Sequence, residues 1–163
     1  MVHYAVLANP GHNRVYFEQS GGLSLAELEV ALGRFSTPCG EIGGKTIAGI
    51  PYVTFAAEAP LSPADLARLS RLSFLYALFV EEGREDAPRL LPVALPDTAY
   101  LPPEVSRILK YTGKTNELFT RLMINIALNS GAYADEPLPR LLDPVAGRGT
   151  TLFEALVWGC SAA

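Results

Sequence analysis

The sequence predicts an α+β protein in two parts: a ferredoxin-like domain over residues 1–83, and the beginning of a Rossmann-like α/β domain over residues 107–163. Two observations lead to this prediction. The first part reads as strand, helix, strand, strand, helix, strand, which is the order of a ferredoxin-like sheet with both helices on one face. The second part contains a short apolar strand, a glycine loop and a helix within residues 141–156, the usual start of a nucleotide-type cofactor site.

The first strand and helix of the N-terminal part are predicted from local patterns. The apolar run Tyr4–Ala8 ends at an Asn-Pro-Gly turn, and Val15–Phe17 gives a second short run that has no place in the ferredoxin-like order. The helix that follows has Ser24 as its expected N-cap, with Glu27 completing a capping box. Its apolar residues recur at helical spacing: Leu25, Leu28, Leu32 and Phe35.

The remaining elements of the first part follow the same reasoning. Residues 41–58 predict two strands joined by a glycine-containing turn, and residues 73–83 predict an aromatic-rich central strand. Between them, Ser62 suits an N-cap and Pro63 the first helical position. Residues 84–106 then carry many prolines, which helices and central strands exclude, so we expect an extended linker there.

The second part predicts a helix from Glu117, a strand ending at Asp143, and a helix beginning at Thr150. Residues 160–163 show no strand pattern, although a parallel sheet requires at least the return strand of its first crossover. We therefore expect an incomplete doubly wound domain. The open edge of such a sheet favours self-association, so a homodimer is an expected partner state.

The composition indicates a folded protein, because 49% of the 163 residues are hydrophobic and 18% are charged. No apolar run reaches the roughly 18 residues of a membrane span, and the N-terminus lacks a signal-peptide pattern, so we expect a cytoplasmic protein without a membrane partner. Cys39 and Cys160 form no CxxC pair, which favours a reduced protein without structural zinc. The net charge of -4 argues against nucleic-acid binding by the whole surface but leaves a local basic patch open.

The glycine loop excludes two common phosphate-binding motifs. A Walker loop requires a lysine after its last glycine, and the loop here has none. A Rossmann dinucleotide loop requires a third glycine at the position of Leu152. What remains is an acidic residue at the end of a strand, Asp143, followed by Gly147-x-Gly149 and two threonines.

This stretch, DPVAGRGTTLFEA, resembles the first S-adenosylmethionine (SAM) motif of methyltransferases that act on exocyclic amines of nucleic-acid bases. The match covers about thirteen residues. With the helix before it and the ferredoxin-like part, the arrangement is similar to THUMP-related tRNA guanine-N2 methyltransferases. The resemblance implies S-adenosyl-L-methionine as cofactor and RNA, in particular tRNA, as partner. The cofactor-binding residues that it implies are Asp143, Pro144, Ala146, Gly147, Gly149, Thr150, Thr115, Asn116 and Phe119.

In that resemblance, Asp143 would accept a hydrogen bond from the ammonium group of the methionine end, and the two glycines would let the backbone approach the cofactor. Thr115, Asn116 and Phe119 would flank it. The motif that grips the target amine and stacks the flipped base, [D/N]-P-P-[Y/F], is missing. We therefore expect the chain to be the N-terminal portion of such an enzyme, to be inactive by itself, and to bind SAM at roughly millimolar affinity or not at all.

Alternatives remain open at this point. A DNA amino-methyltransferase shares the same motif, and a non-catalytic RNA-binding or interaction module could carry a degenerate loop. Thr115 and Asn116 are also good helix caps. Four basic residues could contact phosphates or form a solvated face: Arg107, Lys110, Lys114 and Arg121. His3 is expected to be structural and His12 exposed. Five aromatic residues are expected in the core rather than on a base-stacking surface: Tyr52, Phe55, Phe74, Tyr76 and Phe79.

Overall fold

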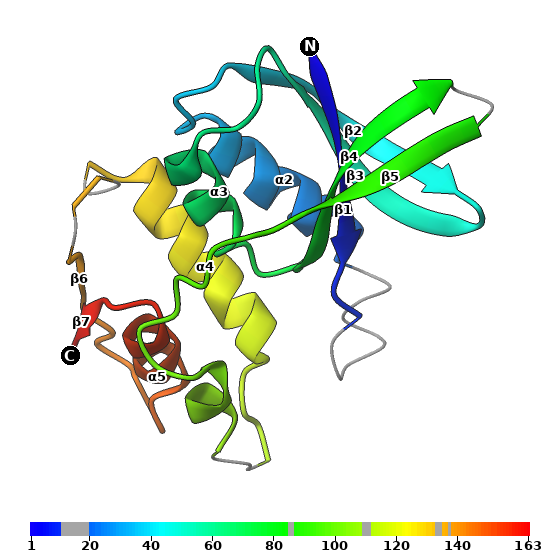
Figure 1. The fold of residues 1–163 in the computed structure, drawn as a ribbon. Helices are drawn as coiled ribbons and strands as arrows, with labels where there is room; N and C mark the ends of the chain where they lie inside the picture. Colours follow the sequence, from blue (N-terminus) through cyan, green and yellow to red (C-terminus); the bar gives the residue numbers. More distant parts are fainter. Residues whose placement is uncertain (11–19, 85–86, 109–111, 133–134, 137) are drawn as a thin grey trace. The chain divides into compact units, whose positions relative to one another are not determined.

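The computed structural model describes residues 1–10, 20–84, 87–108, 112–132, 135–136 and 138–163, and its ribbon is drawn in Figure 1. The chain divides into two compact units, unit 1 over Met1–Pro96 and unit 2 over Asp97–Ala163. The predicted α+β class is confirmed: the described residues form a five-stranded antiparallel sheet, a second sheet of two short strands, and four α-helices. The expected strand Val15–Phe17 and His12 lie outside the described residues.

Unit 1 consists of one sheet and two helices. Its strands lie in the order β2-β3-β1-β4-β5, and every neighbouring pair is antiparallel. The elements are β1 (Val2–Ala8), α2 (Gly21–Leu32), β2 (Cys39–Ile47), β3 (Ile50–Ala57), α3 (Pro63–Leu69), β4 (Leu75–Arg84) and β5 (Ala87–Val93). The first six occur in the order that the sequence predicts.

Both helices of unit 1 cover the same face of the sheet (Figure 1). Alternate residues of a strand point to opposite faces, and the pairs Tyr4–Phe55 and Val6–Leu78 lie directly opposite each other across neighbouring strands. These four side chains therefore share one face, and the rings of Tyr4 and Phe55 stack at 5.1 Å. They pack with residues of both helices into one core, which includes Leu28, Ala31, Leu32 and Leu69.

Part of the expected linker is a strand. Residues 87–93 form β5 and pair with β4, whereas the prolines predicted an extended connection over 84–106. The prolines fit because β5 is an edge strand, where alternate N–H groups point away from the sheet and need no partner. Pro88 and Pro92 are four residues apart and so have the same orientation in the strand.

The expected start of the first helix is wrong by one turn. α2 begins at Gly21 with Ser20 as its N-cap, and Ser24 lies inside the helix. Glu27 does not complete a capping box. Its buried carboxylate instead accepts hydrogen bonds from the backbone N–H of Ser73 at 3.0 Å and from the Ser73 hydroxyl at 2.5 Å. The interaction across 46 residues of sequence outweighs the local capping pattern.

The expected start of the second helix is confirmed. Ser62 caps α3, accepting a hydrogen bond from the backbone N–H of Asp65, and Pro63 occupies the first helical position. Asp65 is the reciprocal partner in this capping box. Its carboxylate also accepts hydrogen bonds from the backbone and side chains of Ser36 and Thr37, which fixes the loop before β2 to the start of α3.

Unit 2 contains η1 (Pro103–Arg107), α4 (Glu117–Ser130), β6 (Arg140–Leu141), α5 (Thr150–Val157) and β7 (Ser161–Ala162). β6 and β7 are parallel, with Arg140 opposite Ser161 and Leu141 opposite Ala162. The expectation of no strand after the last helix is therefore wrong. The return strand is two residues long, too short for any alternating pattern to reveal it in the sequence. None of the described helices is both long and apolar enough to cross a membrane.

Candidate functional site

The glycine loop of unit 2 connects β6 to α5 and contains two residues in the left-handed region. Gly147 has a φ of 56° and Gly149 a φ of 83°, values that L-residues with a side chain rarely adopt. The N–H of Gly149 donates to the carbonyl of Ala146 at 2.7 Å, which closes the turn. These two glycines are required by the backbone conformation of the loop itself.

Asp143 and Pro144 begin this loop. The N–H of Asp143 donates to the carbonyl of Ala163 at 3.0 Å, and the Oδ1 atom of Asp143 accepts from the N–H of Val145 at 3.0 Å. The second bond is an Asx turn, which holds the carboxyl group at the mouth of the loop. Pro144 and Val145 are exposed, and Ala146 is half-buried.

α5 begins directly after the loop, without a side-chain cap. Gly149 is the N-cap residue and has no side chain that could bond the first N–H groups of the helix. These groups and the positive end of the helix dipole suit a carboxylate or another anion. Thr150, the first helical residue, is buried.

The second predicted segment lies at the start of α4. Asn116 is the N-cap, and its side chain accepts a hydrogen bond from the N–H of Phe119 at 3.1 Å. The capping alternative therefore holds for Asn116, whereas Thr115 precedes the cap and is exposed. Phe119 is half-buried.

A buried ion pair joins α4, which follows the Thr115–Asn116 segment, to α5, which follows the glycine loop. Arg121 Nε of α4 donates to Glu154 Oε2 of α5 at 3.2 Å, and the guanidinium carbon of Arg121 lies 4.8 Å from the ring centre of Trp158. Glu154 lies within the stretch that resembles the SAM motif, and the resemblance implies no role for it. A charged residue within the apolar stretch of α5 was the only signal for this pair in the sequence.

Two of the four basic residues near α4, Lys114 and Arg121, do not belong to a solvated face. Lys114 pairs with Glu117 at 2.6 Å and donates to the carbonyl of Ser106 at 2.7 Å. Burial by itself would raise the pKa of Glu117. The hydrogen bond and the charge of Lys114 outweigh this effect, so the pKa of Glu117 is lowered. Arg121 contacts Glu154, and Lys110 lies outside the described residues. Two of the four cations are thus used within unit 2 rather than offered to phosphates.

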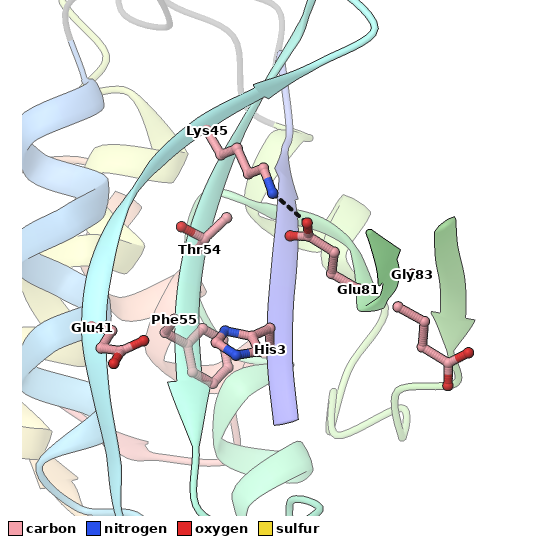
Figure 2. A pocket seen from close by; sticks show the side chains of 8 residues that line it. His3, Glu41, Lys45, Thr54, Phe55, Glu81 and Gly83 are labelled. Atoms are coloured by element: carbon pink, nitrogen blue, oxygen red, sulfur yellow. Dashed lines mark hydrogen bonds and ion pairs between the residues drawn. The ribbon is translucent and has the colours of Figure 1, made fainter. Parts of the chain in front are cut away.

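A second candidate site lies on the helix-free face of the sheet in unit 1. It is a cavity of about 450 Å³. Figure 2 shows Lys45 of β2 reaching towards Glu81 of β4, with which it forms an ion pair. Two strands separate β2 from β4, a distance of about 14 Å in a flat sheet. The sheet must therefore curl for this pair to form. The residues that line the cavity are His3, Glu41, Lys45, Thr54, Phe55, Glu81, Glu82 and Gly83.

The charges of this cavity do not suit a nucleic-acid backbone. Three carboxylates line it, and its only lysine is already paired with Glu81. Excess negative charge repels phosphate. The aromatic residues of the sheet are mainly core, as expected: Phe55, Phe74 and Tyr52 are buried, and Tyr52 packs edge to face against Phe79. Tyr76 is an exception because it is 66% exposed.

Two further chemistries find no support in the described part of the chain. Burial, and then the charge of Asp65, raise the pKa of the Cys39 thiol to about 11, so the thiol stays protonated and is a poor nucleophile at neutral pH. No cluster of three or more histidine, cysteine, aspartate or glutamate residues within the described ranges is arranged to hold a metal ion. Comparison of the chain with protein-family models, curated proteins and solved structures gave no match.

Proposed function

We propose that this chain belongs to a SAM-dependent RNA methyltransferase that modifies an exocyclic guanine amine in tRNA. The observation that supports the proposal most is the conformation of the glycine loop, in which Gly147 and Gly149 both have positive φ between a strand and an uncapped helix start. The sequence motif calls for glycine at these two positions, and the backbone requires it there. The tRNA part of the proposal rests on the resemblance of the motif together with the helix before it and the ferredoxin-like part.

The groups at the loop fit the methionine end of SAM, which carries a carboxylate and an ammonium group. The N–H groups at the start of α5, which no side chain caps, are donors for the carboxylate. The carboxyl group of Asp143, held by its Asx turn, is an acceptor for the ammonium group. The loop thus offers both partners that an α-amino acid needs.

The bound cofactor would supply a methyl group on a positively charged sulfur. An amine can attack the methyl carbon directly, and the sulfur leaves as a neutral thioether. The residues of this chain would bind and orient, because direct displacement depends more on position and desolvation than on a strong base. Asp143 would fix the amino-acid end, and the glycines would keep side chains out of the space next to the backbone.

We also propose a ferredoxin-like arrangement for unit 1, whose role would be to present the RNA. The order β2-β3-β1-β4 with both helices on one face supports this assignment. β5 would be an addition at the edge of the sheet. The carboxylates of the cavity would repel phosphate, so we do not expect RNA to bind to that face of the sheet.

The cofactor part is tested by a ¹H–¹⁵N NMR titration of the chain with SAM, which detects affinities near roughly 1 mM. We expect the amide signals of Gly147 and Gly149 to shift, and Gly149→Ala to abolish the shifts. Gly49→Ala is the matched control, because Gly49 has nearly the same φ, 82°, in the turn between β2 and β3 of unit 1. The proposal would be contradicted if the loop signals did not move at 10 mM SAM, about tenfold above the expected dissociation constant. Equal effects of the two variants on the SAM-induced shifts would also contradict it.

The RNA part is tested separately by filter binding of the chain to a tRNA transcript and to duplex DNA of equal charge. We expect tighter binding of the tRNA, with an affinity that falls as salt rises. Equal or stronger retention of the duplex would favour a DNA amino-methyltransferase. Binding of tRNA without any response of the loop to SAM would favour the non-catalytic RNA-binding module.

A further inference from the structure

Three side chains form a buried polar cluster between α4 and α5: Arg121, Glu154 and Trp158. The Glu154 side chain is 0% exposed and that of Arg121 is 12% exposed, so the 3.2 Å bond between them is shielded from water. The same guanidinium lies over the ring of Trp158, the C-cap residue of α5. One cation therefore contacts a side chain within α5 and the side chain that follows its last residue.

The two residues of the ion pair have equivalent positions in their helices. Arg121 is the fifth residue of α4, which begins at Glu117, and Glu154 is the fifth residue of α5, which begins at Thr150. At about 1.5 Å per residue, each helix start lies about 6 Å along its helix from the pair. One start carries the Asn116 cap, and the other follows the glycine loop. The pair therefore constrains the two predicted cofactor segments relative to each other.

Two polar atoms of this cluster lack hydrogen-bond partners in the part of the chain that the structure describes, which lowers its contribution to stability. Glu154 Oε1 and Trp158 Nε1 are both buried, and neither has a hydrogen-bond partner among the described residues. Buried polar atoms without partners are unfavourable, and apolar side chains of similar size often hold two helices together as well as a buried ion pair does. What the pair adds over apolar packing is direction, because a hydrogen bond to a planar guanidinium permits few relative orientations.

We propose that Arg121 and Glu154 are positioning residues, which hold the starts of α4 and α5 in the one arrangement that brings the two segments of the cofactor site together. This inference rests on the proposed function of the loop. It assigns the pair no contact with the cofactor. Its effect on binding is transmitted through the backbone of the two helix starts.

The test compares Glu154→Gln, Arg121→Lys and the double variant Arg121→Met/Glu154→Met in the full chain. We expect each single variant to reduce the slope of the loop shifts against SAM concentration roughly tenfold or more, the loss expected for one charge-assisted hydrogen bond. Without SAM, the amide signals of Gly147, Gly149 and Phe119 should shift and exchange faster with solvent. Glu81→Gln, which breaks the half-buried ion pair of unit 1, should change none of these signals.

The double variant separates positioning from packing. We expect it to recover the urea midpoint of unit 2, followed by the fluorescence of Trp158, the only tryptophan in the chain, but not the response to SAM. Recovery of the SAM response with stability would overturn the proposal. If the unaltered chain shows no response to SAM, the proposed function fails, and the ligand-free signals still decide: loop glycine signals that are unchanged in Glu154→Gln would refute positioning.

Discussion

Both units of the molecule contain buried carboxylates, and Asp65 of unit 1 and Glu154 of unit 2 are held in different ways. In unit 1, Asp65 is 2% exposed and accepts hydrogen bonds from the amides and hydroxyls of Ser36, Thr37 and Ser62. In unit 2, Glu154 has the charged partner Arg121 at one oxygen and no partner within the described residues at the other. Neutral donors surround a carboxylate that fastens a loop to a helix. A single cation holds a carboxylate that orients two helices.

The difference in partners predicts a difference in what each carboxylate contributes. Many hydrogen bonds to one carboxylate stabilise its charged form and the fold around it. In a buried ion pair, the attraction between the two charges mainly offsets the free energy lost when both are removed from water. Deleting one partner is costly because the other charge then stays buried without a partner. The following experiments measure that contrast, from the largest expected effect to the smallest.

The largest effect is expected from Arg121→Met. The variant leaves Glu154 charged, fully buried and without its cation, so the free energy of unfolding of unit 2 should fall by about 3–5 kcal/mol. Urea unfolding followed by Trp158 fluorescence measures it. A loss below about 1 kcal/mol would mean that water takes the place of Arg121 at the Glu154 carboxylate, and the contrast with Asp65 would disappear.

Asp65→Asn should have the second largest effect, a loss of about 2–3 kcal/mol in unit 1. The amide keeps one acceptor oxygen but turns an NH₂ group towards donors from Ser36, Thr37 or Ser62, which then lack a partner. Urea unfolding followed by far-UV circular dichroism measures it, because the signal includes α3 and the sheet. Since Trp158 lies in unit 2, its fluorescence transition should stay unchanged, and a shift of that transition would contradict separate roles for the two carboxylates.

The pH dependence of that loss gives a third prediction. Burial by itself would raise the pKa of Asp65, but the hydrogen bonds from Ser62, Thr37 and Ser36 outweigh it and hold the pKa well below its ordinary value. The contribution of Asp65 is then complete above the unfolded pKa of about 4 and decreases as the pH falls towards the lower folded pKa. The stability difference between the unaltered chain and Asp65→Asn should therefore shrink between pH 5 and pH 2 (about one to two units on each side of that pKa). A constant difference would contradict the lowered pKa.

These sites also show which features the sequence can predict. The α3 cap was predictable because Ser62, Pro63 and Asp65 lie within four residues and act on one another. The start of α2 was not, because the partner of Glu27 is Ser73, far along the chain. The loop glycines follow from local backbone conformation and were predicted. The cavity depends on the register of several strands, which single-sequence patterns do not indicate. The pair of Arg121 with Glu154 depends on the packing of two helices, and the only sign of it in the sequence is a charged residue within the apolar stretch of α5.

The smallest effect compares two serines that look alike in the sequence. Ser62→Ala removes a cap that the structure shows, so unit 1 should lose about 1 kcal/mol of unfolding free energy. Ser24→Ala lies inside α2, where alanine is the better helix former, so its effect should stay within about 0.5 kcal/mol of zero. Circular dichroism in urea resolves both. An equal loss in the two variants would place the start of α2 at Ser24, and the long-range bond of Glu27 to Ser73 would then no longer explain where that helix begins.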